Sequence, residues 1–376
     1  MTPTLVLFDD RVAREWMPFV LTRPAGELLY GTCTLRARAE RAFGLPCAGH
    51  LSAPHLASFD EPDAPSVLDA ARLPRDRDLI LLSSRAVPMW NVPPTLPESG
   101  RSGPIVLGDE ICGYVVAAGS QLPPPEFFDE PMAVRSDEEP ALSLEGEIIE
   151  RPWHLVAGNA DRIAADIEAL FPGHRDPVPS GVHVLGDAPL VLGEGVEIEP
   201  GVVIDLRGGP VWLDRGVRIS AHTRLAGPAY VGPDSQLLGG PYEAVSLGPV
   251  CRTRGEIEAS IILGYSNKAH EGFLGHSYLG RWVNLGALTT NSDLKNTYGA
   301  IRMWTPGGMM DTGETKLGCF LGDHVKTAIG TLLNTGTVIG AGTNVFGERM
   351  PANYVPPFTW GTGDAPDVYG LEKFLE

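Results

Sequence analysis

Aliphatic residues recur at every sixth position through the second half of the chain, and glycine often follows them, as in Leu247-Gly248. One clear run consists of Leu213, Ile219, Leu225, Val231 and Leu237. A period of six is typical of the hexapeptide repeat, in which each unit supplies a short strand with an inward aliphatic side chain and a turn. Three units complete a triangular coil, and stacked coils are about 4.8 Å apart. The pattern therefore predicts a left-handed parallel β-helix over 176–350, because a sandwich would show a period of two.

The first 175 residues show other patterns, which predict an α/β domain. Short apolar runs of buried-strand length occur at 5–8, 79–83, 104–107 and 112–118. Helical spacing marks 32–43 and 159–171, and the second helix is followed by Pro172-Gly173, a stop signal. Residues 121–152 are rich in proline and acids and predict a linker. We expect a C-terminal tail at 351–376.

Composition narrows the class of protein. The 376 residues are 43% hydrophobic, and the net charge of −18 argues against a nucleic-acid or anionic-membrane partner, since both need a basic surface. The five cysteines are scattered, without a CxxC pair, which favours a reduced protein lacking a disulfide framework. The N-terminus has no signal-peptide pattern and no apolar stretch approaches about 20 residues. We therefore expect a cytoplasmic protein.

Two interruptions of the repeat, at 239–260 and 291–316, flank a dense cluster of polar residues. The cluster comprises Lys268, His270, His276, Asn284, Asn291 and Lys295. A β-helix core needs none of these side chains, and unpaired polar groups are costly to bury. They form either a solvated face with hydrogen-bonded corners or a functional site, and their density favours the site.

The stretch from Gly248 to Lys295 resembles a known acyltransferase motif. It contains GPVCRTRG at 248–255, NKAHEGFLG at 267–275 and VNLGA at 283–287. These segments are similar to the acetyltransferase domain of the GlmU-like bifunctional family, which acetylates glucosamine-1-phosphate and then uridylylates it. FDD at 8–10, TRPAGELLYG at 22–31 and PPFTWG at 356–361 resemble a divergent branch of that family, so the resemblance covers nearly the whole chain.

The resemblance implies a role for individual residues. His270 falls on the general base and Arg254 on an arginine that binds the sugar phosphate. Lys268, Asn284, Asn291 and Lys295 are further substrate-binding candidates, and Ala287 and Thr327 are implied to meet acyl-CoA. Phe273 stands where the family has tyrosine, and Ala259 where it has a phosphate-binding lysine. The resemblance also implies acetyl-CoA as acyl donor and a homotrimer with sites between subunits.

The residue types suit acyl transfer to an amine. A histidine with a pKa of about 6.5 can take the proton of the attacking amine. Backbone N–H groups in the tight Gly286-Ala287 turn could stabilise the thioester oxyanion. Zinc hydration is an alternative, with His222, His270 and His276 as ligands. However, His270 and His276 are one hexad apart and would sit on successive faces of the triangle.

For the N-terminal domain the resemblance implies a nucleotidyltransferase-like fold. Active members place a glycine-rich loop and a lysine after the first strand, and this chain keeps only Thr22-Arg23-Pro24. Arg23 is expected to contact a nucleotide phosphate or to pair with Glu27. Asp109 is expected either to hold Mg²⁺ with a nucleoside triphosphate or to belong to a strand-ending turn.

Three hypotheses result. The leading one is CoA-dependent acylation of an amino-sugar phosphate. The second is sugar-1-phosphate nucleotidyl transfer with UTP or dTTP, the β-helix serving trimer assembly. The third is a non-catalytic trimeric scaffold.

Overall fold

The computed structural model describes residues 2–90, 92, 94–96, 98, 100–131, 139–347, 350–362 and 366–375. The chain divides into two compact units. The first consists of Met1–Trp16, Val20–Leu28 and Cys33–Pro152, and the second of Met17–Phe19, Leu29–Thr32 and Trp153–Glu376. The domain boundary that the sequence pattern places at 175 stays a prediction. Helix α4 (Asn159–Leu170) and most of α3 (Pro152–Ala157) are grouped with the second unit, and α4 packs against strands of that unit.

The first unit contains a six-stranded mixed sheet with the order β4-β1-β5-β8-β7-β9. Its strands are β1 (Thr4–Phe8), β4 (Cys47–Leu51), β5 (Leu79–Ser83), β7 (Gly103–Leu107), β8 (Glu110–Val116) and β9 (Leu142–Leu144). Strand β1 runs parallel to both neighbours, whereas β8 is antiparallel to β5 and β7. Helix α1 (Leu35–Phe43) begins where the Thr34 hydroxyl accepts from the Ala37 N–H at 3.1 Å. The four apolar runs and the first helix are thus confirmed.

Part of the expected linker at 121–152 is ordered structure, which corrects that prediction. It contains α2 (Pro125–Asp129), β9 and β10 (Gly146–Ile148), and β10 pairs with β6 (Ala86–Pro88). Leu142 and Leu144 are buried on the same side of β9, which pairs in parallel with β7. The many prolines and acidic residues of this stretch made the alternation of buried and exposed residues in β9 hard to recognise in the sequence. Residues 132–138 of the same stretch lie outside the described part.

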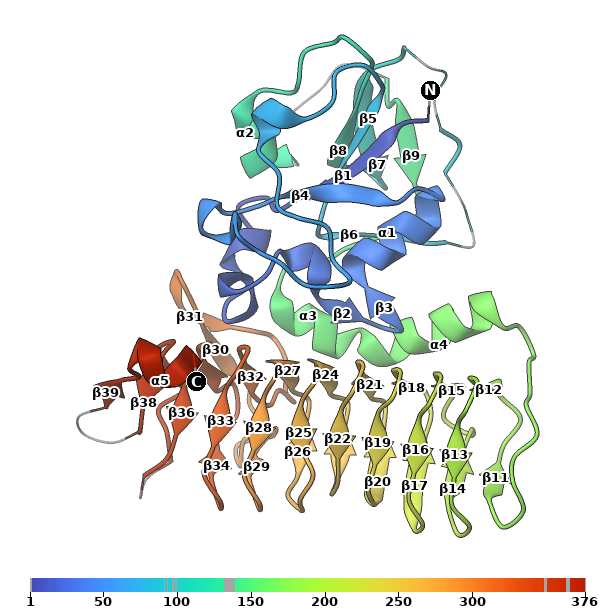
Figure 1. Ribbon diagram of the computed structural model, residues 1–376, viewed down its shortest axis with the longest axis vertical. Helices are drawn as coiled ribbons and strands as arrows, with labels where there is room; N and C mark the ends of the chain where they lie inside the picture. Colours follow the sequence, from blue (N-terminus) through green and yellow to red (C-terminus); the bar gives the residue numbers. More distant parts are fainter. Residues whose placement is uncertain are drawn as a thin grey trace. The chain divides into compact units, whose positions relative to one another are not determined.

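The second unit is a left-handed parallel β-helix, as the period of six predicts (Figure 1). Its described strands form three long sheets. The six-stranded sheet contains β11 (His183–Leu185), β14 (Val203–Asp205), β17 (Thr223–Ala226), β20 (Gly240–Glu243), β23 (Ile257–Glu258) and β26 (Leu274–Gly275). The nine-stranded sheet contains β12 (Leu190–Leu192), β15 (Val211–Leu213), β18 (Ala229–Val231), β21 (Ser246–Leu247), β24 (Ile261–Gly264), β27 (Tyr278–Arg281), β32 (Phe320–Leu321), β35 (Val338–Ile339) and β37 (Tyr354–Val355). The ten-stranded sheet contains β13 (Glu197–Ile198), β16 (Arg218–Ile219), β19 (Gln236–Leu237), β22 (Arg252–Thr253), β25 (Asn267–Lys268), β28 (Asn284–Leu285), β33 (Lys326–Thr327), β36 (Asn344–Val345), β38 (Thr359–Trp360) and β39 (Asp367–Val368).

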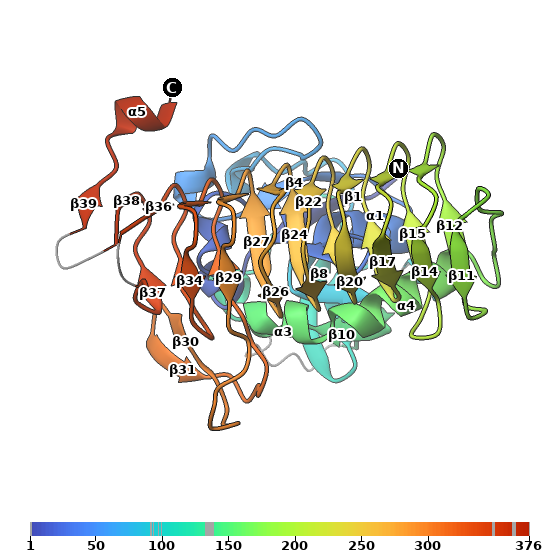
Figure 2. The ribbon, with the colours of Figure 1, turned by 90° about the horizontal axis from the view of Figure 1, so that it is seen from below.

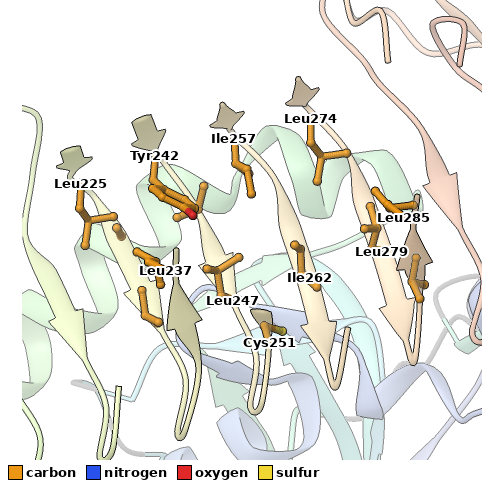
Figure 3. Packing of buried hydrophobic residues seen from close by; sticks show 14 of the residues in the cluster. Leu225, Leu237, Tyr242, Leu247, Cys251, Ile257, Ile262, Leu274, Leu279 and Leu285 are labelled. Carbon is orange, nitrogen blue, oxygen red and sulfur yellow. The ribbon is translucent and has the colours of Figure 1, made fainter. Parts of the chain in front are cut away.

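The interior of the β-helix is a ladder of buried, mostly aliphatic side chains contributed by successive short strands (Figure 3). Leu225, Tyr242, Ile257 and Leu274 come from consecutive strands of the six-stranded sheet and point inward. All four side chains are at most 2% exposed. Burial of each such aliphatic side chain contributes about 1.5–3 kcal/mol, so the repeated inward position stabilises every coil.

The outer surface of the nine-stranded sheet is covered along much of its length. Ile163 and Ile167 of α4 pack against Val191 and Tyr230 of this sheet. Farther along, the Tyr278 hydroxyl accepts from the Leu29 N–H at 2.8 Å and donates to the Leu29 carbonyl at 3.0 Å. Figure 2 shows the β-helix from another side, with α3 and α4 running beside its strands. This face is therefore closed by the chain itself.

The two interruptions of the repeat have different structures. The interruption at 239–260 remains part of the coils: it forms strands β20 to β23 in coils shorter than three hexads, with Leu237, Thr253 and Lys268 in equivalent inward positions. The interruption at 291–316 leaves the coil after β29 (Thr290–Asn291) and contains the hairpin β30 (Arg302–Thr305) and β31 (Gly308–Asp311).

None of the helices in the described ranges is long and apolar enough to span a lipid bilayer.

Candidate functional site

Several of the expected residues lie along one edge of the β-helix, where the chain turns from the ten-stranded to the six-stranded sheet. Arg254 follows β22, His270 follows β25, Ala287 follows β28 and Ile329 follows β33. Backbone hydrogen bonds join consecutive turns: the Leu288 N–H donates to the Glu271 carbonyl at 2.9 Å and the Gly330 N–H to the Ala287 carbonyl at 2.8 Å. We call this row of turns the His270 edge. Its residues are far apart in sequence but follow one another at the spacing of the coils.

The His270 side chain is exposed at the tip of its turn. Within the described residues, no hydrogen bond or ion pair engages its imidazole. Its backbone carbonyl, however, accepts from the Lys268 ammonium at 3.1 Å. The backbone of the turn is thus held in place while the ring remains available to a ligand.

Lys268 occupies an inward position of the coil, where neighbouring coils have Thr253 and Leu285. Its side chain is 3% exposed, and its Nζ donates to the carbonyls of Arg254, His270 and Gly272 at 2.7, 3.1 and 2.7 Å. Burial lowers the pKa of Lys268 to about 8, and nearby Glu271 opposes this shift. Because all three N–H bonds are used, the geometry gives Lys268 a role in holding the turn; its expected contact with substrate stays a prediction.

Arg254 and Glu271 form an ion pair on the surface of the His270 edge. The Arg254 Nε lies 2.8 Å from the Glu271 Oε1, and the side chains are 48% and 59% exposed. A second guanidinium nitrogen donates to the Leu238 carbonyl at 3.2 Å. Asn284 lies on the outer surface of the ten-stranded sheet, where its Oδ1 accepts from Asn267 at 2.7 Å. Both Arg254 and Asn284 are therefore accessible.

The turn at Gly286-Ala287 is held from inside the coil by two threonine hydroxyls. The buried Thr327 hydroxyl accepts from the Gly286 N–H at 3.0 Å and lies 2.7 Å from the Thr289 hydroxyl. The Ala287 N–H donates to no group of the described chain. Thr327 thus supports the turn from inside the coil, and Ala287 carries the available N–H.

A groove with mostly apolar residues in its lining, but with more polar than apolar exposed surface, continues the His270 edge beyond Ala287. It has a volume of about 110 Å³ and includes Ile329, Leu332, Phe346 and Met350 among its lining residues. Ile329 is 78% exposed, an unusual position for a large aliphatic side chain. Such a surface offers a ligand chain both apolar and polar contacts.

Two of the expected substrate ligands point elsewhere. Asn291 is buried, and its amide bonds both the N–H and the carbonyl of Gly275 at 3.0 Å. The Lys295 ammonium donates to the Ala300 carbonyl within the extruded segment. Both side chains therefore stabilise the fold around the site rather than line the His270 edge, and their expected contact with substrate is untested.

The three histidines of the zinc alternative are not brought together. His276 follows β26 at a different corner from His270, and its Nδ1 lies 2.8 Å from the Asp293 Oδ2. The hydrogen bond from His276 lowers the pKa of Asp293. His222 lies several coils away on the His270 edge. Across the described ranges, no group of three or more His, Cys, Asp or Glu residues could hold a metal ion.

In the first unit, Arg23 forms an ion pair and Asp109 lies in a turn between two strands. The buried Arg23 guanidinium pairs with Glu61 at 2.9 Å, and Glu27 contacts Arg36 and His50. Asp109 is exposed in the two-residue turn between β7 and β8, where Gly108 has a φ of 62°. Asp109 thus lies in a strand-ending turn, and its expected contact with Mg²⁺ stays a prediction.

A cavity of about 680 Å³ lies in the first unit near the carboxyl ends of β1 and β4. Its lining includes Phe8, Asp9, Ser52, Arg72 and Phe128. Asp9 is 3% exposed, and burial raises the pKa of its carboxyl group. The carboxyl ends of parallel strands are where open α/β sheets bind ligands, so this is a second candidate site.

Sequence reasoning missed two acidic partners of the site region, Glu271 and Asp293. Arg254 and Glu271, Asn267 and Asn284, and His276 and Asp293 are each 17 residues apart. In these coils, side chains at that separation stack on one another. A spacing of 17 residues, one less than three hexads, is the sequence pattern that could have identified Glu271 and Asp293 as partners.

Comparisons with known proteins agree with this architecture. A family model described as "Sugar nucleotidyl transferase" matches residues 5–175. A bifunctional sugar-1-phosphate nucleotidylyltransferase/acetyltransferase of Sulfurisphaera tokodaii is 27% identical over 198 residues, covering 53% of this chain and 44% of that protein. The bifunctional protein GlmU of Azoarcus sp. (strain BH72) is 27% identical over 197 residues, covering 46% and 39%.

The matched region thus spans less than half the length of either relative, and both relatives are bifunctional by name. The expected resemblance is confirmed at modest identity: the chain is similar to bifunctional GlmU-like proteins, and its sugar nucleotidyl transferase segment is followed by a left-handed parallel β-helix.

Proposed function

We propose that the β-helix transfers an acyl group from CoA to the amine of an amino-sugar phosphate at the His270 edge. The observation that carries this proposal is the order of groups along that edge. Arg254, His270, Ala287 and Ile329 follow one another there. They supply an arginine with the partners named above, an imidazole and a backbone N–H without a hydrogen-bond partner among the described residues, and a groove lined mainly by apolar residues. These groups meet the needs of the phosphate, the amine, the thioester carbonyl and the pantetheine arm.

The chemistry of each residue follows from its surroundings. His270 takes a proton from the amine as its lone pair attacks the thioester carbonyl carbon. The Ala287 N–H donates to the oxyanion that forms. Collapse of the tetrahedral intermediate breaks the carbon–sulfur bond, and the proton passes from His270 to the leaving thiolate. Acetyl-CoA is the donor that we propose, since the name of the Sulfurisphaera tokodaii relative includes an acetyltransferase. A homotrimer with sites between subunits remains our prediction.

The experiment is a thiol-release assay with acetyl-CoA and glucosamine-1-phosphate, followed by detection of the N-acetylated product by mass spectrometry. Release of thiol that requires the amino-sugar phosphate supports the proposal. No acetylated product across a panel of amino-sugar phosphates would refute it.

A second candidate function is sugar-1-phosphate nucleotidyl transfer in the first unit. It is favoured by the family match over residues 5–175 and by the cavity beside β1 and β4. The loop after β1 lacks the glycine-rich sequence and the lysine of active enzymes, and no Mg²⁺ ligand set is found among the described residues. Pyrophosphate release from UTP or dTTP with a sugar-1-phosphate would support it. Silence of both assays would leave the trimeric scaffold as the best hypothesis.

A further inference from the structure

The ion pair between Arg254 and Glu271 joins two consecutive coils beside the proposed base. Its Nε–Oε1 distance is 2.8 Å, and about half of each side chain is exposed. Glu271 is adjacent in sequence to His270, so its carboxylate shares the turn that carries the imidazole. An exposed pair of this kind contributes little to stability, because solvent screens it. Its position invites a functional explanation.

The other cation of this turn is already committed. The buried Lys268 ammonium donates to three backbone carbonyls, and no hydrogen remains for a ligand. The turn therefore offers a ligand one exchangeable cation, Arg254, and one exchangeable anion, Glu271. An amino-sugar phosphate carries the complementary charges: near neutral pH its small ring bears a phosphate, which can pair with Arg254, and an ammonium group, which can pair with Glu271.

We propose that Arg254 and Glu271 form a clamp for a zwitterionic acceptor, and that the two side chains pair with each other when the acceptor is absent. Arg254 binds the phosphate and Glu271 binds the ammonium group beside His270. This inference rests on the proposed function and adds a specificity-determining residue to it. Glu271 is thus a positioning residue, which selects the amine and holds it near the base.

The clamp also fits the proton balance of the reaction. The bound ammonium must lose one proton to become a nucleophile, and that proton leaves through His270 to solvent. The neutral amine then attacks the thioester, and its second proton ends on the sulfur of CoA. Glu271 stabilises the ammonium form, so its contact is broken as the amine is released to attack.

The test compares binding of glucosamine-1-phosphate and glucose-1-phosphate by calorimetry, in the wild-type protein and in Glu271→Gln. The two ligands differ in the amine. We expect Glu271→Gln to weaken binding of glucosamine-1-phosphate about three- to tenfold, because the ammonium contact is lost. It should tighten binding of glucose-1-phosphate by a similar factor, because Arg254 no longer has a competing carboxylate.

The matched control is Glu197→Gln, since Glu197 also pairs across coils with an exposed arginine, Arg218, at 3.4 Å. This control should leave both affinities unchanged. Glu271→Asp should recover part of the preference for the amine, whereas a loss of folding would shift both ligands together and show in the circular dichroism spectrum.

Opposite shifts of the two affinities support the clamp. Equal shifts, no shift, or no binding of either sugar phosphate to the wild-type protein would overturn it. The thiol-release assay is read separately: if it is silent while the opposite shifts are seen, the proposed acyl transfer fails and the clamp stands as a binding site.

Discussion

The Lys268 ammonium donates to the Gly272 carbonyl at 2.7 Å, and thereby ties the turn that carries His270 to the interior of the coil. The Arg254 and His270 carbonyls share the same ammonium group. Replacing Lys268 with Met would leave three carbonyls without this donor. We expect the free energy of unfolding to fall by about 1–3 kcal/mol, measured by urea denaturation at pH 7. Unchanged stability would show that the three contacts are dispensable.

The same lysine predicts a pH dependence. Burial lowers the pKa of Lys268 to about 8, below the ordinary lysine value of 10.5. Between these two values the unfolded chain binds more protons than the folded protein, so stability attributable to Lys268 rises with pH over about 8–10.5. The unfolding free energy of the wild-type protein minus that of Lys268→Met should therefore increase from pH 8 to pH 10. A decrease would mean that the three carbonyls hold the pKa above 10.5.

His270→Ala should reduce acyl transfer by a factor of about 10² to 10⁴, because the amine then lacks its base. The measurement is kcat in the thiol-release assay. His222→Ala is the matched control, since His222 is another exposed histidine on the same edge. Near-normal kcat in His270→Ala, with the control also normal, would remove His270 from the chemistry.

Arg254→Ala should raise KM for the phosphorylated acceptor about tenfold or more, with a smaller effect on kcat, since a charge-assisted contact to phosphate is lost. Arg218→Ala removes a comparable exposed arginine several coils away and should leave KM unchanged. If the KM values of the two variants agree, Arg254 does not bind the phosphate.

Ile329→Asp should raise KM for acetyl-CoA and leave KM for the acceptor unchanged, because it places a charge among the apolar residues that line the groove. Val368→Asp provides the control, as Val368 is equally exposed, at 79%, but does not line the groove. Saturation curves for each substrate distinguish the two effects. A higher KM for the acceptor alone would place CoA elsewhere.

Tyr278→Phe should destabilise the protein by about 1–3 kcal/mol, because the hydroxyl satisfies both the N–H and the carbonyl of Leu29 in a buried position. Thermal unfolding followed by circular dichroism measures this loss. Tyr298→Phe is a suitable control, since Tyr298 is 74% exposed. Equal melting temperatures for the two variants would contradict the role of Tyr278.

The sequence by itself determined the β-helix, because inward aliphatic residues such as Leu237 and Leu285 must recur once per short strand whatever surrounds them. It also led to His270, since a polar cluster in a repeat that needs none is visible without coordinates. The strands of the first unit, such as Leu79–Ser83, were equally legible as buried apolar runs.

Only the tertiary structure decided how the polar residues divide between site and scaffold. The side chains of Lys268, Asn291 and Thr327 bond backbone groups of the coil, which the sequence does not reveal, and their expected contacts with ligands stay predictions. The partners of Arg254 and His276 depend on a coil that brings residues 17 positions apart into register, rather than 18. The stacking of the coils determines which side chains contact each other. The six-residue period alone does not predict these contacts, because the coils differ in length.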